Sequence, residues 1–408
     1  MVPKGWKRVP IKDVCESIID CVNKTAPVVD YETPFKMIRT TNVRNGRVNT
    51  EDVRYVTEDT YLQWVRRGKP QVGDIIFTRE APVGEAGVLQ DAEGIFLGQR
   101  TMMYRADTCL SDNYFLFYSL SSPFCQKQIE DFSNGGTVAH MRVPDCGEIL
   151  INLPPFLEQK KIAQILSTWD KAISVTEKLL TNSQQQKKAL MQQLLTGKKR
   201  LLDENGVRFS GEWEVVRLKQ LIHEEKKRNR DNHIQRVLSV TNHSGFVLPE
   251  EQFSKRVASE DVSTYKIVKK NQYGYNPSRL NVGSFARLDN YDEGVLSPMY
   301  VVFSINHERL NSDYFLNWMS SNEAKQRIAG STQGSVRDSV GFDALCSFSF
   351  SLPTLMEQQK IAAVLSVADA EISTLEKKLA CLRDEKKALM QQLLTGKRRV
   401  KVDEAVAE

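Results

Sequence analysis

The sequence lacks the patterns that hold metals and disulfides in proteins. It has seven cysteines among 408 residues, an odd number, and no two of them form a CxxC pair. The five histidines form no HxxxH pair. A disulfide framework or a zinc ribbon needs such spacing, so we expect neither, and no metal site. We expect the cysteines to be buried or incidental thiols.

Long apolar runs and a strong excess of one charge are also missing. No apolar stretch approaches the ~18 residues that span a membrane. The basic opening "MVPKGWKRVPIKDV" is not followed by the apolar segment of a secretory signal, so we expect a cytoplasmic protein. The formal net charge of +5 permits nucleic-acid binding without requiring it. The length and the 41% hydrophobic content favour two or three globular domains.

What the chain does contain is a long internal repeat. The twelve residues "KKALMQQLLTGK" occur at 187–198 and again, unchanged, at 386–397. With the same offset of 199, the match extends without a gap over 154–201 and 353–400. A repeat of this length indicates a duplicated architecture.

The repeated segments have the period of an α-helix. Apolar residues recur every three or four positions in both copies, from 162 to 194 and from 361 to 393. A proline precedes each stretch and a glycine follows it, as expected at helix ends. Two rods with matching apolar stripes favour an antiparallel coiled coil with a pseudo-two-fold axis. The alternative is that each helix belongs to a separate ordinary core.

The blocks before each helix are related more faintly. Trp6 aligns with Trp213, and "MIRTTNV" (37–43) aligns with "VLSVTNH" (237–243). Segments rich in β-branched and aromatic residues, such as "GDIIFT" and "SFSFSL", lie between turn residues and predict strands. Short helices are expected near 112–130 and 312–329. We therefore predict an α+β protein with two mixed α/β domains separated by two long helices.

The sequence resembles the specificity subunit of type I restriction–modification systems over nearly the whole chain. The resemblance rests on "LPPFLEQKKIAQILS", "LPTLMEQQKIAAVLS", the paired "KKALMQQLLTGK" endings, the "GW…V.I.DV" opening, "VLSVTNHSGFV" and "QYGYNPSRLNVGS". It implies six segments: a first target-recognition domain (1–157), a central conserved helix (158–197), a linker (198–212), a second target-recognition domain (213–356), a distal conserved helix (357–396) and a C-terminal tail (397–408).

The resemblance also implies a function and partners. In that family each target-recognition domain recognises one half of an interrupted site on double-stranded DNA. The helices set the gap and dock two modification (methyltransferase) subunits, and a restriction subunit joins the complex. The chain itself would have no catalytic residue and no cofactor, whereas its partners would use S-adenosylmethionine, and ATP with Mg for restriction.

Two short patterns imitate catalytic motifs. "LPPF" (153–156) is similar to an adenine-methyltransferase motif, but Asn152 stands one residue too early. Asp145, Glu158 and Lys160 imitate a nuclease site that would hold Mg²⁺, but the second copy has Gln359 in place of the lysine. Glu158 and Lys160 also belong to the helical repeat, which explains them without catalysis.

The candidate DNA contacts are polar and basic residues in irregular segments between strands. Arginine pairs with guanine, asparagine pairs with adenine, and basic side chains bind phosphates. The candidates are Arg39, Thr40, Asn42, Arg44, Arg79, Arg100, His140 and Arg142 in the first domain, and Thr241, Asn242, His243, Arg279 and Arg337 in the second. Asn42 and Asn242 have a simpler alternative, since either residue can cap a turn.

Two other functions remain open at this stage. One is a coiled-coil scaffold that joins two protein-binding domains and has no role with DNA. The other is a self-sufficient restriction enzyme, which the absence of a glycine-rich methyl-donor loop disfavours. The charged run "HEEKKRNRD" (223–231) is expected to be a solvated surface segment, with contact to phosphates as the alternative.

Overall fold

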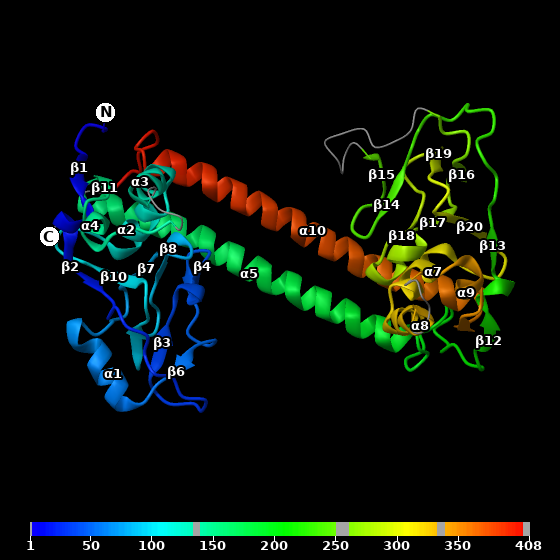
Figure 1. Ribbon diagram of the computed structural model, residues 1–408, viewed down its shortest axis with the longest axis horizontal. Helices are drawn as coiled ribbons and strands as arrows, with labels where there is room; N and C mark the ends of the chain where they lie inside the picture. Colours follow the sequence, from blue (N-terminus) through cyan, green and yellow to red (C-terminus); the bar gives the residue numbers. More distant parts are fainter. Residues whose placement is uncertain (1, 134–138, 250–260, 333–338, 403–408) are drawn as a thin grey trace. The chain divides into compact units, whose positions relative to one another are not determined.

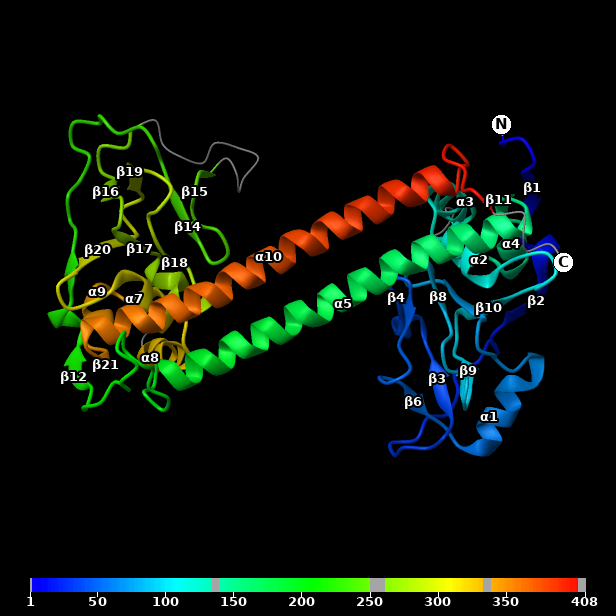
Figure 2. The same ribbon diagram turned by 180° about the vertical axis from the view of Figure 1, so that it is seen from behind.

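The computed structural model describes residues 2–133, 139–249, 261–332 and 339–402 (Figures 1 and 2). Its contacts divide the chain into two units. Unit 1 combines residues 1–178 with 377–408, and unit 2 comprises residues 179–376. The two longest helices, α5 (Phe156–Leu194) and α10 (Leu355–Leu393), each contribute to both units.

Unit 1 is built on a four-stranded antiparallel sheet of order β2-β10-β7-β8. A two-stranded sheet β1-β11, a three-stranded sheet β6-β3-β9 and the hairpin β4-β5 complete it. The elements are β1 (Lys7–Pro10), η1 (Ile11–Val14), β2 (Cys15–Asp20), β3 (Lys36–Ile38), η2 (Thr40–Asn42), β4 (Val43–Arg44), β5 (Arg47–Val48), β6 (Arg54–Tyr55), α1 (Glu58–Trp64), η3 (Val65–Arg67), β7 (Ile75–Arg79), β8 (Val83–Val88), β9 (Ile95–Leu97), β10 (Thr101–Ala106), α2 (Asn113–Leu120), α3 (Pro123–Ser133), α4 (Val143–Gly147) and β11 (Leu150–Leu153).

Unit 2 repeats this plan. Its four-stranded sheet has the order β13-β20-β17-β18, and β12 pairs with β21 as β1 pairs with β11. The elements are β12 (Glu214–Arg217), η4 (Leu218–Gln220), β13 (Ile222–Glu224), β14 (Ser239–Thr241), β15 (Gly245–Val247), β16 (Lys266–Lys269), β17 (Tyr273–Tyr275), η5 (Pro277–Val282), β18 (Phe285–Arg287), β19 (Glu293–Leu296), β20 (Val301–Ile305), α7 (Ser312–Met319), α8 (Asn322–Thr332), α9 (Phe342–Cys346) and β21 (Ser349–Leu352). The internal repeat therefore includes the globular domains, as predicted.

Each unit contains the start of one long helix and the end of the other. The core of unit 1 includes Ile162 and Leu166 of α5 together with Leu393 of α10, all fully buried. The core of unit 2 includes the equivalent residues Ile361 and Leu365, with Leu194 as the contribution from the other helix. The repeated apolar stripe therefore fills two equivalent cores.

Polar contacts show that the two helices run antiparallel within each unit. In unit 1, Lys386 donates to Asp170 at 2.5 Å and Arg383 donates to Glu177 at 2.8 Å. In unit 2 the equivalent Lys187 pairs with Asp369. The partner's number falls as the residue number rises, which is the pattern of antiparallel chains.

Both helices begin and end at other residues than predicted. The predicted first residues are Glu158 and Glu357. Each helix begins two residues earlier, directly after the proline-containing turn. Each ends three residues before its glycine, because Gly197 and Gly396 adopt left-handed φ values of 70° and 69° and reverse the chain. The amide of Lys199 then donates to the carbonyl of Gln193, which closes the helix end.

A buried carboxylate joins three segments of unit 1 that are far apart in the sequence. The guanidinium of Arg399 donates from Nε and Nη2 to both oxygens of Glu158, each at 2.7 Å. The indole of Trp6 donates to the same carboxylate at 3.1 Å, and the guanidinium lies 5.7 Å from the Trp6 ring centre. Only 3% of Glu158 is exposed. These three residues form the first closing triad.

Unit 2 has the same arrangement with the chain segments exchanged. Arg200 donates to both oxygens of Glu357 at 2.6 and 2.8 Å, and Trp213 donates to it at 3.1 Å. This is the second closing triad. Each arginine follows one long helix and binds the glutamate at the start of the other. The predicted linker 198–212 and tail 397–408 therefore begin with residues that belong to the folded units.

The glutamine after each of these glutamates ties the start of its long helix to the loop that leads into α2 or α7. Gln159 donates to the carbonyls of Leu110 and Pro154 and accepts from the amide of Asp112 at 3.0 Å. Gln358 makes the equivalent bonds, including the acceptor contact with the amide of Asn311 at 2.8 Å. Both side chains are almost fully buried. The repeated Glu-Gln pair thus has a structural role.

All seven cysteines are free thiols, and most of them are shielded. Burial raises the pKa values of Cys125 and Cys146 to about 12, so these thiols stay protonated and unreactive at neutral pH. Cys109 and Cys381 are exposed. Over the described residues, no helix combines the length and the apolar character that crossing a membrane requires.

The first closing triad gives a stability prediction. Replacing Arg399 with methionine leaves the buried charge of Glu158 with Trp6 as its remaining partner in the triad. We expect unit 1 to lose about 2–3 kcal/mol, at the low end for a buried pair because the arginine is partly solvated. Hydrogen exchange of the full chain should show faster exchange in residues 1–178 and unchanged exchange in 179–376.

Arg398→Met is the matched control, because the neighbouring Arg398 is exposed. Equal effects of the two substitutions, or a loss of protection in unit 2, would contradict the role of Arg399.

Candidate nucleic-acid interface

The 3-10 turn η2 contains the first group of candidates. Asn42 is 4% exposed, and its side chain accepts from the amide of Arg39 and donates to the carbonyls of Asn49 and Asp52. These bonds fix the turn, so the capping alternative describes Asn42 in this structure. Arg39 precedes the turn and is half-buried, as is Thr40.

Three other candidates of unit 1 converge on the loop 80–82 that follows β7. Arg44 donates to the carbonyl of Ala81 at 3.4 Å and to that of Thr40 at 2.7 Å. Arg100 and His140 both approach the carboxylate of Glu80, at 3.0 and 3.4 Å. The side chains of Arg100 and His140 are about half exposed, at 49% and 44%. The structure therefore brings these candidates together in one polar cluster.

Arg79, the residue before this loop, is buried beneath the cluster and holds its backbone in place. It is 6% exposed, pairs with Asp20 at 3.0 Å, and donates to the carbonyl of Met141 at 3.2 Å. A buried, paired arginine positions its neighbours and is not available to a ligand. The sequence analysis did not identify Asp20 or Glu80, although a cluster of several arginines needs carboxylates to stabilise it.

Arg142 lies at the start of α4, with 77% of its side chain exposed. It pairs with Asp145 through two bonds, at 2.8 and 3.1 Å. Asp145 and Glu158 of the nuclease-like pattern are thus bound to different arginines, Arg142 and Arg399. No group of three or more His, Cys, Asp or Glu side chains that could hold a metal ion occurs within the described part of the chain.

In unit 2 three of the candidates lie at the turn of the hairpin β14-β15. Thr241 accepts from the amide of Ser244 at 3.0 Å, which shapes the turn, while Asn242 and His243 are exposed. Asn242 therefore differs from Asn42, although both follow a threonine in equivalent segments. A bond from Ser284 Oγ to the carbonyl of Val240 at 2.8 Å holds the hairpin against the segment after η5.

Arg279 lies in η5 with an exposed side chain. The amide of Ser278 donates to the side chain of Asn276, which begins this turn. Because the hairpin packs beside η5, Arg279 and Asn242 belong to the same region of unit 2. Arg337 lies outside the described residues.

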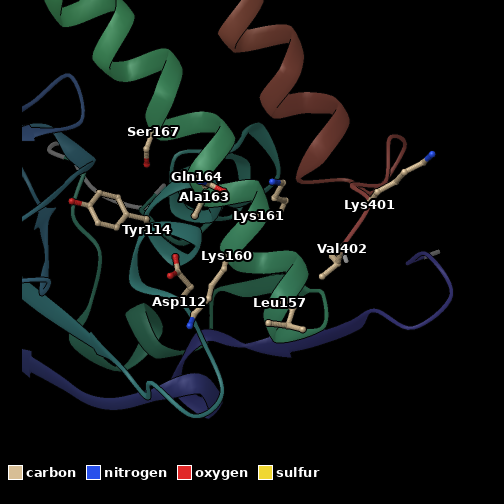
Figure 3. Close-up of a pocket in the computed structure, with 10 residues that line it drawn as sticks. All are labelled: Asp112, Tyr114, Leu157, Lys160, Lys161, Ala163, Gln164, Ser167, Lys401 and Val402. Atoms are coloured by element: carbon tan, nitrogen blue, oxygen red, sulfur yellow. The ribbon is translucent and has the colours of Figure 1, made fainter. Parts of the chain in front are cut away.

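A basic groove of about 560 Å³ lies in unit 1 beside the start of α5 (Figure 3). Its walls include Lys160 and Lys161 of α5, Lys401 of the segment after α10, and Asp112 and Tyr114 at the start of α2. Figure 3 shows Asp112 and Tyr114 on one side of α5, and Lys401 on the other. Lys160 also lies over the ring of Phe156, at 4.6 Å, and so helps to cover the helix start.

Glu177 links the candidate region of unit 1 to the helices, and the sequence analysis missed it. It accepts from Arg47 of β5 at 2.9 Å and from Arg383 of α10 at 2.8 Å. Partial burial raises the pKa of Glu177, but the hydrogen bonds from the two arginines outweigh burial and leave the pKa below its ordinary value. The β4-β5 hairpin, which includes Arg44, is thereby fastened to both helices.

Replacing Asn42 or Asn242 with alanine should change the free energy of unfolding by different amounts. Asn42→Ala removes buried hydrogen bonds and should lower the free energy of unfolding by about 1–3 kcal/mol. Asn242→Ala removes an exposed side chain and should change it by less than about 0.5 kcal/mol. Urea denaturation of both variants measures the difference, and similar values would contradict the assignment of Asn42 to the turn.

The contacts of Glu177 predict a pH-dependent stability. Since its folded pKa lies below the unfolded value, its stabilisation is present above the unfolded pKa of about 4.5 and is lost as pH falls through the folded pKa. Glu177→Gln should therefore destabilise the protein at pH 7, by under about 1 kcal/mol because the arginines are half exposed. The difference from the wild type should shrink near pH 4.

Urea midpoints at both pH values test this. Glu376→Gln, at the equivalent position of the second repeat, is the control. A difference between Glu177→Gln and the wild type that stays constant with pH would refute the ionic role of Glu177.

Comparisons with known proteins agree with this architecture. The family model of the type I restriction modification DNA specificity domain matches twice, at residues 3–182 and 210–382. The specificity subunit of the type I restriction enzyme MjaVIII from Methanocaldococcus jannaschii is 24% identical, with 98% of this chain and 94% of that protein covered. The putative MjaX specificity subunit of the same organism is also 24% identical, with 98% and 95% covered.

A solved structure shares the fold. The crystal structure of the S subunit of a type I restriction–modification system from M. genitalium has a TM-score of 0.58 and 15% sequence identity. It covers 95% of this chain and 96% of its own. With two copies of the family domain, matching unit cores and closing triads in both copies, the chain belongs to the type I restriction–modification DNA specificity family.

Proposed function

We propose that the chain is the DNA-recognition subunit of a type I restriction–modification complex. Each globular domain recognises one half of an interrupted site on double-stranded DNA. The observation that carries this proposal is that the two units have the same fold. The same sheet order occurs twice beside helices that share the internal sequence repeat, while the loops that would face a ligand have diverged more. A duplicated scaffold with two different surfaces suits a ligand made of two different half-sites.

The exposed candidates form the proposed interface. In the first domain these are Arg100, His140 and Arg142, and in the second they are Asn242, His243 and Arg279. Arginine suits guanine edges and phosphates, and asparagine suits adenine edges. The other described candidates take supporting roles, because they are buried or half-buried: Arg39, Thr40, Asn42, Arg44, Arg79 and Thr241. Arg337 stays a proposed contact from the sequence alone.

The helices serve as spacer and docking surface in this proposal. They pair as an antiparallel coiled coil that sets the gap between the half-sites. Leu157 and Met356 occupy equivalent positions near the start of each helix and are 38% and 60% exposed. Exposed apolar side chains at repeated positions suit a partner that binds twice. We assign two modification subunits to these positions.

The remaining partners follow from this assignment. A restriction subunit joins the complex, which acts in the cytoplasm. The partner subunits use S-adenosylmethionine for methyl transfer, and ATP with Mg for restriction. The chain contributes recognition and assembly, and the chemistry takes place on its partners.

A genome-wide map of methylated adenines in the host tests the proposal. Deleting the gene should abolish methylation at one motif, made of two short half-sites around a fixed gap. A strain that expresses the Asn242→Ala variant should retain the motif but lose selectivity in one half-site only. The wild-type gene restored at another locus is the control.

If the deletion leaves every motif intact and the purified complex does not bind duplex DNA, the proposal fails. A coiled-coil scaffold for two protein-binding domains would then take its place.

A further inference from the structure

The charged segment that follows β13 in unit 2 pairs with the start of β16. The amide of Ile267 donates to the carbonyl of Lys227 at 2.8 Å, and the amide of Asn229 donates to that of Tyr265 at 2.9 Å. Arg228 therefore stands opposite Lys266 of β16 as an antiparallel bridge. Residues 226–229 are thus held in an extended conformation on the sheet.

Asn229 anchors this segment. It is fully buried, and its side chain donates to the carbonyl of Ile234 at 2.8 Å and accepts from the amide of the same residue at 3.1 Å. The neighbours on either side, Arg228 and Arg230, are exposed. A buried asparagine that fixes the backbone keeps the basic side chains on the surface in a defined place.

The cations on this edge oppose one another. The bonds on either side of Arg228 and Lys266 make them a non-hydrogen-bonded pair, the closer of the two antiparallel arrangements. Like charges in directly opposite positions destabilise a sheet. Lys226, two residues before Arg228, extends toward the same face and is 77% exposed. These three residues, Lys226, Arg228 and Lys266, form what we call the basic edge.

The chain neutralises the basic edge only in part. Glu224 pairs with Lys226 at 3.0 Å, whereas Glu225 is bound by Ser304 at 2.8 Å. Arg228 donates to the carbonyl of Thr264 and Lys266 to that of Tyr300. Burial lowers the pKa of Lys266. The charge of Glu224 opposes this shift, whereas those of Arg228 and Lys226 add to it. The arrangement costs stability in the free chain, which an anionic ligand would recover.

We propose that the basic edge binds the phosphate backbone of DNA next to the second half-site. This inference rests on the proposed function. Two cations on one strand face stand about 6.8 Å apart, since each residue advances the strand by about 3.4 Å. That spacing is similar to the separation of successive phosphates along a nucleic-acid strand. Lysine binds phosphate as a point charge and arginine binds it through its planar fork, so both residue types suit a phosphate backbone.

The salt dependence of DNA binding tests the proposal. The complex of the chain with its modification subunits is titrated with its target duplex at several salt concentrations. Each phosphate contact contributes about 0.9 to the slope of log K against log salt. Lys226→Gln with Arg228→Gln should reduce this slope by about 1.8, while the methylated motif stays the same.

Arg217→Gln with Lys219→Gln is the matched control. It removes one exposed arginine and one exposed lysine, two positions apart in the sequence, from β12 and η4 of unit 2. Its slope should equal that of the wild type. Arg228→Lys, combined with native Lys226, should also keep the wild-type slope, because the charge is retained.

The possible outcomes separate the basic edge from the proposed function. An unchanged slope for the double variant, or an equal loss in the control pair, would overturn the basic edge as a DNA contact while the proposed function stands. Tighter binding of RNA than of duplex DNA that depends on Lys226 and Arg228 would also overturn it. If the wild-type complex itself fails to bind duplex DNA, the proposed function fails as well.

Discussion

A buried glutamate at the start of each long helix is the constraint on which the fold depends. A carboxylate in a core is costly unless it is paired and hydrogen-bonded. Glu158 and Glu357 each receive two bonds from an arginine and one from a tryptophan. The tryptophan comes from the first strand region of the domain and the arginine from beyond the other helix. Three distant segments must therefore meet before either charge is satisfied.

This constraint explains why the long helices have diverged less between the two copies than the exposed turns have. The helices must supply a glutamate, a glutamine, an apolar stripe and a terminal glycine in each copy, so their sequences have stayed more alike than those of the globular domains. The turns at η2 and at β14-β15 lie outside these triads. They can vary without unsatisfying a buried charge, and the exposed candidates lie there or in neighbouring loops.

The sequence predicted the repeat, the helices and the mixed α/β domains, because helical period and turn residues are local signals. It did not predict the closing triads, since Trp6, Glu158 and Arg399 are far apart in the chain. A signal was present: Arg200 and Arg399 occupy the same position after identical "TGK" sequences. Asn42 and Asn242 show the limit of local patterns. Both follow a threonine, but one is buried by contacts with residues 49 and 52, which no short motif encodes.

The exchange of helix ends between the units also affects the order of folding during synthesis. Unit 2 lies entirely within residues 179–376, whereas unit 1 needs residues 377–402 to fill its core and neutralise Glu158. The domain that the ribosome begins first is therefore completed last. At about 5–20 residues per second, its incomplete core waits on the order of ten to forty seconds for the end of the chain. During that interval the half-built first domain is the part of the nascent protein most exposed to chaperones and to aggregation.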